Sequence, residues 1–509
     1  MRKTQLFVSI IALLLVASSL LTTVSASANY TAMIVQGNTS DVNDCKVVFE
    51  ALKDVPNGNS YTIFNRGWHY NNGDSYHNYD MWQAGHSGDP EYALACEQNL
   101  IDAGTHDVLY WSGHGGSNPI RLNVHPSNAA NDYGPGNSQQ PAFSIASTLK
   151  VTTSNWANTC EWDKNSNLKV AIFACCLVVD NSDGDCMYLV RAMKASNVRV
   201  IAGYHTTSPT HPADIRIAER FFSNTTNGGV AGGESIRSSW QTANELSGSY
   251  GWAVLCYKEG GNQYYRMPGF PGKTYSEPSN DATVYRFWSS YSDSTGGQPM
   301  TPTSISSISN NALPLEITVA VSDVSPASAD GNNVLTVYRE MYDGNQFDLD
   351  ESTQRNIAEN YLNEKHTYGL ESIATVSCEE MSSEIGAVPE TAVVVGKTFC
   401  YSNHYNGIRM VDNFYKVATD ANGVYFTIDK WKDIVAYGSE TFGTASVISA
   451  EDARLAVVKP ETDIMTNAEL VYVPINETTY RLCYAITTED SFIYYVDCAT
   501  GVEVEAFIS

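Results

Sequence analysis

The chain has 509 residues, a length typical of two or three domains. Its formal net charge is −26 and it has no cluster of Lys and Arg, which argues against a nucleic-acid partner because phosphate binding needs a basic surface. The eleven cysteines are an odd number, so at least one thiol has no disulfide partner within the chain.

The first residues predict a secretory signal peptide over 1–28. Two basic residues precede an apolar segment at 6–21, and Ala26-Ser27-Ala28 is a small-x-small cleavage site. An uncleaved membrane anchor is the alternative, but the apolar run is short for a spanning helix. We therefore expect a secreted, extracellular protein with no membrane contact after signal cleavage, in a compartment where disulfides form.

Strands and helices alternate from residue 31 to residue 257. The predicted strands are 31–35, 61–64, 108–111, 169–176, 198–203 and 251–257, and the predicted helices are 42–52, 91–103, 186–195, 213–223 and 235–246. This alternation is typical of an α/β fold with a mostly parallel sheet. Right-handed crossovers would place helices on both faces of that sheet.

Two polar segments interrupt the alternation. Residues 65–89 form a long loop rich in aromatic and His side chains, and we interpret it as a wall that faces the substrate. Aromatic packing over the sheet edge is the alternative. The spacing of its three histidines fits no metal-ligand template, so no metal site is predicted. Residues 117–165 read as an insertion.

The pattern changes after residue 288. Residues 289–312 are rich in Ser, Thr, Gly and Pro and predict a linker between an α/β domain at 29–288 and an α+β domain at 313–509. The predicted elements of the second domain are strands at 317–321 and 334–338, a helix at 351–364, strand-like alternation over 391–428, a helix that starts at a Ser449–Asp452 capping box, and strands at 469–473, 480–487 and 492–497.

Two of the predicted strands end in residues that suit a cysteine nucleophile. The apolar run 108–111 is followed by His114, and the run that begins at Lys169 ends in Cys175 and Cys176. Ligands of an open parallel sheet bind outside the carboxyl ends of its strands, so we expect an imidazole beside a thiol there. The imidazole can take the thiol proton and the thiolate can attack. An unpaired cysteine that only fills the core is the alternative.

These stretches resemble the caspase, legumain, gingipain and clostripain group of peptidases. The shared mark is an apolar strand ending in His-Gly, followed by one ending in Ala-Cys; here these are His114-Gly115 and Ala174-Cys175. The helix and strand predicted after Cys175 are also similar to gingipain. The resemblance covers roughly residues 30–257.

The resemblance implies a caspase-like sheet with helices on both faces and a cysteine endopeptidase that acts on a protein or peptide, without a cofactor. Cys175 would be the nucleophile, and His114 would polarise the scissile carbonyl or shuttle protons. The N–H groups of Gly115 and Cys175 would form the oxyanion hole. Where the family has a Gly-containing turn, this chain has Cys176-Leu177, so Cys176 is the alternative nucleophile.

Side-chain specificity is not inherited from the resemblance. Caspases and legumains have a polar pocket residue two positions before the cysteine, where this chain has Phe173. The candidate pocket residues are Phe173, Tyr204, His205 and Trp68. The acidic turn 180–185 predicts a helix cap, with structural calcium as the alternative. A catalytically inactive, caspase-like extracellular binding protein is the alternative function.

The last third resembles the PepSY and FTP propeptide modules of secreted metallopeptidases. The matching stretches are Tyr405–Ile408, Ser449–Ala453, Leu470–Pro474, Arg481–Tyr484 and Tyr495–Gly501. This resemblance implies an intramolecular C-terminal module that inhibits the peptidase, as in a zymogen, or assists its folding.

The last predicted hairpin, over 480–497, also predicts a disulfide. Its expected register places Cys483 opposite Cys498, and opposed Cβ atoms lie about 4.5–5.5 Å apart, near what a disulfide needs. Cys378 and Cys400 then pair by elimination. Reduced cysteines packed in the sheet are the alternative.

Overall fold

The computed structural model describes residues 28–36, 44–55, 58–67, 98–115, 119–121, 142–151, 160–181, 186–209, 213–223, 229–247, 250–257, 265–271, 283–293, 313–320, 350–362, 369–381, 392–438, 441–442, 448–457, 465–488 and 493–507. Several predictions lie outside these residues: the signal peptide up to residue 27, the aromatic loop beyond residue 67, the start of the helix at 91–103, residues 182–185 of the acidic turn, and the strand at 334–338.

The first half is organised around a parallel sheet in the order β2-β1-β3-β7-β8. These strands are β1 Asn29–Gln36, β2 Ser60–Gly67, β3 Val108–Ser112, β7 Val170–Ala174 and β8 Val200–Tyr204. The next strand, β9 (Trp252–Tyr257), runs antiparallel to β8. The strands predicted from the apolar runs are confirmed, as is the α/β class at this coarse level.

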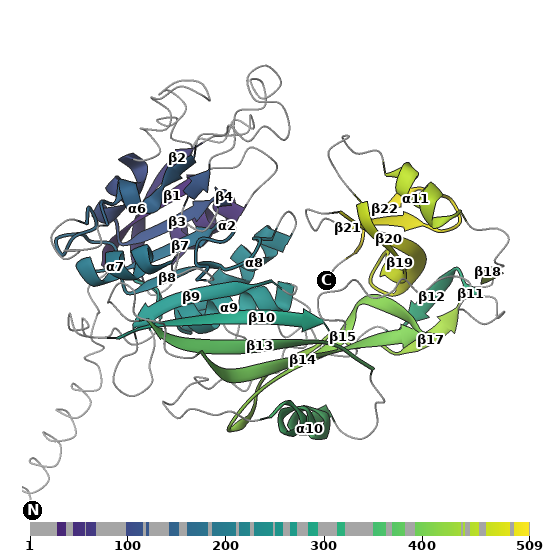
Figure 1. Cartoon of the computed structure of the whole chain (residues 1–509). Helices are drawn as coiled ribbons and strands as arrows, with labels where there is room; N and C mark the ends of the chain where they lie inside the picture. Colours follow the sequence, from purple (N-terminus) through teal and green to yellow (C-terminus); the bar gives the residue numbers. More distant parts are fainter. Residues whose placement is uncertain are drawn as a thin grey trace, which may run out of the picture.

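Helices cover both faces of this sheet, as predicted (Figure 1). On one face lie α2 Asp44–Lys53, α8 Ala213–Phe222 and α9 Ile236–Ser247; on the other lie α6 Ile145–Thr148 and α7 Met187–Ala195. Short 3-10 turns occur at Ala103–Thr105 and Val230–Gly232. Strand side chains alternate between the two cores, so Tyr110 packs on the α8 and α9 side and Trp111 on the α7 side.

The predicted insertion at 117–165 has structure of its own where it is described. The strand β4 (His114–Gly115) pairs with β5 (Pro119–Arg121), and β5 pairs with β6 (Ala142–Ser144). His114 therefore does not simply follow β3, as expected, but belongs to a small antiparallel sheet that starts directly after it.

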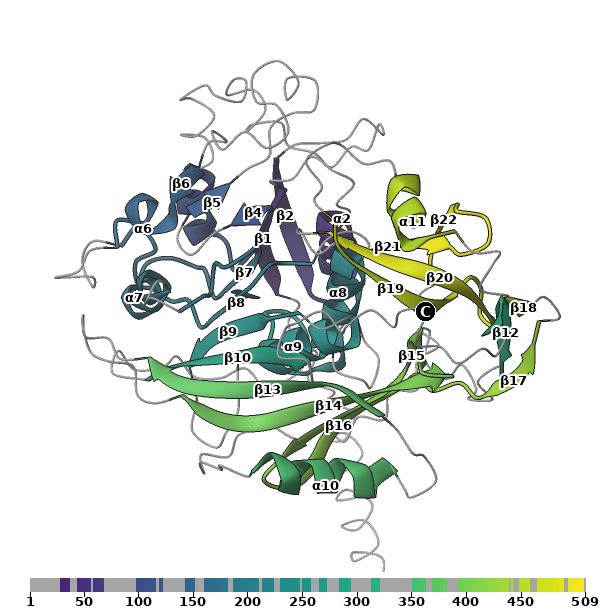
Figure 2. The same cartoon turned by 45° about the vertical axis from the view of Figure 1, so that its right-hand side comes forward.

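The strand β10 (Val284–Asp293) joins the two halves of the protein, and it corrects the predicted linker. One edge of β10 pairs with β9, and the other pairs with β13 (Gly369–Met381) over ten residue pairs. Figures 1 and 2 show the three strands side by side. Residues 289–293 are thus sheet, and 294–312 lie outside the described part of the chain.

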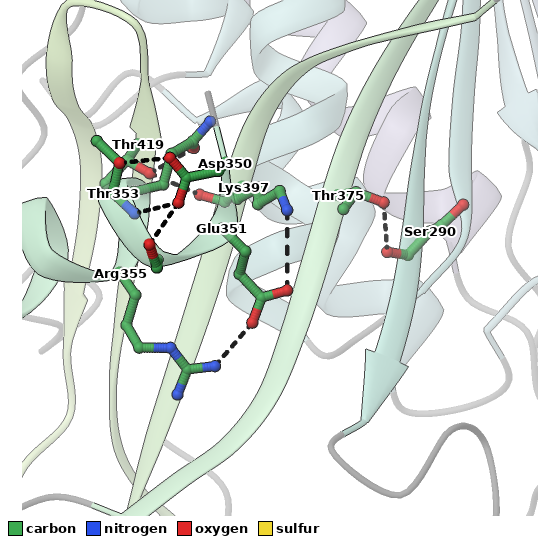
Figure 3. Close-up of polar contacts among 10 residues, drawn as sticks. Ser290, Asp350, Glu351, Thr353, Arg355, Thr375, Lys397 and Thr419 are labelled. Carbon is green, nitrogen blue, oxygen red and sulfur yellow. Dashed lines mark hydrogen bonds and ion pairs between the residues drawn. The ribbon is translucent and has the colours of Figure 1, made fainter. Parts of the chain in front are cut away.

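The sheet continues through a meander of long antiparallel strands. They are β13, β14 Val393–Tyr405, β15 Ile408–Asp420 and β16 Gly423–Asp429. The helix α10 (Glu351–Leu362) packs against them, and the Asp350 carboxylate caps its first turn by accepting the Thr353 N–H at 2.9 Å. Figure 3 shows Glu351 between Arg355 and Lys397 of β14. The Glu351 carboxylate lies 2.8 Å from Nη2 of Arg355 and 3.8 Å from Nζ of Lys397.

A second lobe follows, joined to the meander by a short parallel pairing of β15 with β19. Its elements are β11 Leu313–Pro314, β12 Glu316–Val319, β17 Ile434–Tyr437, β18 Thr441–Phe442, α11 Ala450–Ala456, β19 Met465–Pro474, β20 Thr479–Thr488, β21 Ile493–Asp497 and β22 Glu503–Val504. The predicted capping box is confirmed, because Ser449 and Asp452 satisfy each other's backbone N–H groups.

In the described residues, seven α-helices accompany one large mixed sheet that runs through both halves. None of these helices has the length and apolar character needed to cross a membrane.

Candidate active site

The carboxyl ends of β3 and β7 lie side by side, as the sequence predicted. The parallel ladder between them ends with Ser112 opposite Ala174, and the Gly113 N–H donates to the Ala174 carbonyl at 3.4 Å. His114 and Cys175 therefore follow directly on neighbouring strands at the same edge of the sheet. The side chain of His114 lies outside what the structure describes.

Gly115 packs directly on the backbone of the two cysteines. A Cβ atom at this position would stand 2.4 Å from the carbonyl oxygen of Cys176, 2.8 Å from Cβ of Cys175 and 2.9 Å from Cγ2 of Val178. Real Cβ atoms do not approach that closely, so only glycine fits here. The glycine of the His-Gly motif thus has a steric role here, because it lets the His-Gly and Cys-Cys dipeptides touch.

The Cys175 thiol lies in the core on the α7 side of the sheet. It is completely buried, and its Sγ donates to the Trp111 carbonyl at 3.6 Å. Burial raises the pKa of this thiol well above its usual value; nearby Cys176 and Asp44 raise it further, and the Gly113 N–H opposes them. Cys175 is therefore a neutral thiol in this arrangement, not a thiolate.

Cys176 has a different environment. It is only half-buried, and its Sγ accepts the Ser208 N–H at 3.2 Å, with the Ser208 hydroxyl also at 3.2 Å. Of the two cysteines, Cys176 is the more accessible one.

The segment that carries the thiols, residues 175–181, is held in a strained turn. Leu177 has a φ of 58°, in the left-handed region that side chains other than Gly, Asn and Asp rarely adopt. Its N–H donates to the Thr206 carbonyl at 2.9 Å, and the Val179 N–H donates to the Tyr204 carbonyl at 3.0 Å. Backbone strain of this kind clusters at functional sites, where the surrounding structure enforces it.

The candidate pocket residues that the structure describes do not come together. Phe173 is buried on the α7 side of the sheet, whereas Tyr204 is buried on the opposite side, where its ring lies 5.4 Å from that of Trp240. Alternation along strands accounts for this correction, because two residues on opposite faces cannot line one pocket. Trp68 lies outside the described residues.

His205, the fourth candidate, is tied to β10. Its Nε2 lies 2.7 Å from the Ser289 carbonyl, which gives this nitrogen the donor role. Burial lowers the pKa of the imidazole; the Ser289 carbonyl opposes this effect, and nearby Arg286 adds to it. His205 therefore acts as a neutral donor that joins two strands.

Sequence reasoning missed an acidic cluster at the same sheet edge, on the α2 and α8 side. Asp44 is 1% exposed and accepts the Tyr110 hydroxyl at 2.9 Å and the Cys45 N–H at 2.7 Å. Burial raises the pKa of Asp44, and burial together with Asp44 raises the pKa of Asp214 to about 7. Both residues lie in the first turn of a helix, where an Asp ordinarily predicts only a cap.

The predicted disulfides are not formed. Cys483 pairs with Asp497 instead of Cys498, and the two cysteines pack in different cores, so their side chains lie on opposite faces of the hairpin. A register shift of one residue has this effect, because side chains alternate between faces. Cys378 and Cys400 lie on neighbouring strands but not opposite each other, and none of the four cysteines forms a disulfide.

Comparisons with known proteins place the chain in no family. No family model and no curated protein matches its sequence. Among solved structures, the C-terminal domain of YpeB from Bacillus megaterium is similar over 32% of this chain and 97% of its own length. The identity is 12% and the TM-score is 0.17, a value at which the likeness carries no argument.

Proposed function

We propose that the protein is a secreted cysteine endopeptidase that hydrolyses peptide bonds at the carboxyl edge of β3 and β7. The contact between Gly115 and the backbone of Cys175-Cys176 carries this proposal. It brings the turns that follow two adjacent parallel strands against each other, at the edge where such sheets bind ligands. The caspase-like resemblance of the two motifs supports the same assignment.

The proposed reaction uses residues of these two turns. The His114 imidazole takes the proton of Cys175, and the thiolate attacks the scissile carbonyl carbon. The N–H groups of Gly115 and Cys175 hold the negative charge on the carbonyl oxygen. His114 then protonates the departing amine, and water hydrolyses the thioester to release the carboxylic acid and restore the thiol.

In the described arrangement, the Cys175 thiol is not accessible to a substrate. A thiol that is fully buried and has a raised pKa cannot reach a peptide carbonyl, so turnover requires residues 175–181 to move. Cys176 stands as the alternative nucleophile, since it is partly exposed and its sulfur accepts an N–H.

The burial of Cys175 also favours a second candidate function. A caspase-like sheet whose cysteine only fills the core would serve as an extracellular binding protein without catalysis. Substrate cleavage that a thiol-blocking reagent stops distinguishes the peptidase from this alternative.

The region after residue 313 takes part in the proposed enzyme as a PepSY- or FTP-like module. The ten-pair ladder between β10 and β13 supports a role in folding, since it makes this region part of the sheet that carries the site. Release of an inhibitor through a cut linker is less well supported, because the strand β10 occupies residues 289–293 of the predicted linker.

A fluorogenic peptide library tests the proposed function on the full-length secreted protein, with and without iodoacetamide. We expect cleavage that iodoacetamide abolishes, that Cys175→Ala removes and that Cys176→Ala retains. The reverse result for the two variants would make Cys176 the nucleophile. Cleavage that survives both substitutions and iodoacetamide would exclude thiol catalysis, and no cleavage by the parent protein would favour the binding protein.

A further inference from the structure

Glu379 of β13 reaches from the second half of the chain to the segment that carries the thiols. Its Oε1 accepts a hydrogen bond from Nη1 of Arg286 at 3.1 Å and another from Nδ2 of Asn181 at 3.0 Å. The side chains of Glu379 and Arg286 are 7% and 5% exposed, so this is a buried ion pair with additional hydrogen bonds. Asn181 is the last described residue of the segment 175–181 before α7.

Arg286 extends the connection to the backbone of the same segment. Its Nε donates to the Val179 carbonyl at 3.0 Å, and its guanidinium lies over the Trp288 ring at 4.4 Å from the centroid. The stacked ring fixes the plane of the guanidinium, which has donors in a rigid fork. Glu379 thus holds Val179 through Arg286 and holds Asn181 directly.

These contacts lie close to the contact between the thiols and the His-Gly turn. Val178, between the thiols and the two anchored residues, is one of the three neighbours that a Cβ at Gly115 would meet. Leu177 occupies its strained conformation two residues before Val179. A displacement of the anchored end would therefore change the position of Cys175 and Cys176 relative to Gly115.

We propose that Glu379 is a positioning residue for the thiol segment, and that the region after residue 313 thereby completes the candidate site. The carboxylate does not touch the reacting atoms; it acts through Arg286 and Asn181. The catalytic role of Glu379 rests on the proposed function, whereas its contacts that anchor residues 175–181 do not. Removing the charge leaves a buried guanidinium without its counter-ion, so the anchor should fail even when the side-chain volume is kept.

The test compares Glu379→Gln with Glu380→Gln in the full chain. Glu380 is the next residue of β13, its side chain points to the other face of the sheet, and the same substitution there is a matched control. Three measurements are made: hydrogen exchange of the peptide covering 175–181, the rate of Cys175 alkylation mapped by mass spectrometry, and kcat and KM on a cleaved peptide.

We expect Glu379→Gln to speed exchange in 175–181 and alkylation of Cys175 at least ~10-fold, because the closed turn loosens. We expect kcat to fall about 10²-fold with little change in KM, because a loosened segment that has moved to let Cys175 reach the substrate no longer holds the thiol in one position and misplaces it by about 1 Å. Glu380→Gln should match the parent protein in all three measurements. A purely structural role would instead lower the melting temperature and speed exchange throughout β10 and β13, with normal turnover per folded molecule.

Unchanged exchange and alkylation in a folded Glu379→Gln variant would overturn the inference, as would a rise in kcat. If that variant does not fold, Asn181→Ala removes only the direct contact on the thiol segment and decides by the same measurements. If no form of the protein cleaves peptides but Glu379→Gln still loosens residues 175–181, the positioning role stands and the proposed function fails. If the parent protein cleaves peptides and Glu379→Gln and Asn181→Ala both behave like it, the proposed function stands and the inference fails.

Discussion

Gly115 and Cys176 are packed so closely that a methyl group on Gly115 would stand 2.4 Å from the carbonyl oxygen of Cys176. The two residues follow different strands and lie sixty-one positions apart in the sequence. Their contact fixes the spacing of the two turns that carry His114 and Cys175, and it makes that spacing open to a direct test.

Gly115→Ala should separate the two turns. The added methyl would meet the backbone carbonyl oxygen of Cys176 and Cβ of Cys175, which cannot rotate away, so we expect a loss of roughly 1–3 kcal/mol of stability. Turnover should fall about 10²-fold because the reacting groups are displaced. Gly438→Ala is the control, since the nearest atom to its Cβ is Cβ of Glu316 at 3.2 Å, a tight contact that a shift of a few tenths of an ångström relieves. Equal activity of both variants would show that the close contact is not required. Thermal melts and peptide turnover are the measurements.

His114→Ala should reduce turnover at least ~10²-fold, the usual effect of losing a positioned acid–base group. His205→Ala is the comparison at the same sheet edge. It should cost about 1 kcal/mol of stability through the lost hydrogen bond to Ser289, with turnover largely kept. If His205→Ala abolishes turnover and His114→Ala does not, the catalytic histidine has been assigned to the wrong strand end.

A fragment that ends at residue 293 should not gain activity. It would expose the edge of β10 along the ten residues that pair with β13, and unpaired strand edges promote aggregation. We expect aggregation or a much lower melting temperature, measured by light scattering and circular dichroism. A monodisperse fragment that cleaves faster than the full chain would instead support an inhibitory role for the C-terminal region.

Stability should decrease as the pH rises from 5 to 8. The folded-state pKa of Asp214 is raised to about 7, so the folded form keeps a proton that the unfolded form releases near pH 4. That contribution is complete below pH 4 and is lost as the pH rises through 7. We expect a change of roughly 3 kcal/mol between pH 5 and pH 8. Asp214→Asn should remove this part of the pH dependence of stability. The remaining part, due to Asp44, has the same sign, because the pKa of Asp44 is also raised. A urea midpoint whose pH dependence is the same in the variant would contradict the assignment.

The parts of the fold that could be predicted from the sequence are those set by local pattern. The apolar runs of β3 and β7 become buried strands, with only Ala174 at the end of β7 partly exposed, and the Ser449 capping box starts a helix where expected. The strand β10 could not be predicted, because Ser289, Ser290 and the serines after them read as a linker; only the ladders with β9 and β13 make them a strand.

The rest of the site depends on partners far away in the sequence. A Glu in a strand ordinarily indicates a solvent-facing position, and Glu379 is buried only because Arg286 meets it across a ladder. The sheet face on which a hairpin side chain lies depends on the pairing register. A difference of one residue in the register moves the side chain to the other face, as at Cys483. Neither relationship leaves a signal within a short window of sequence.

The position of β10 between β9 and β13 has a consequence for synthesis. When residues 284–293 have been made, one edge of β10 can already pair with β9, but the strand that covers its other edge ends only at residue 381. The sheet that carries the candidate site therefore stays open at one side until the β13 sequence has been translated, and during that interval its edge can pair with other chains. A stalled or prematurely terminated chain would be retained in an aggregation-prone form.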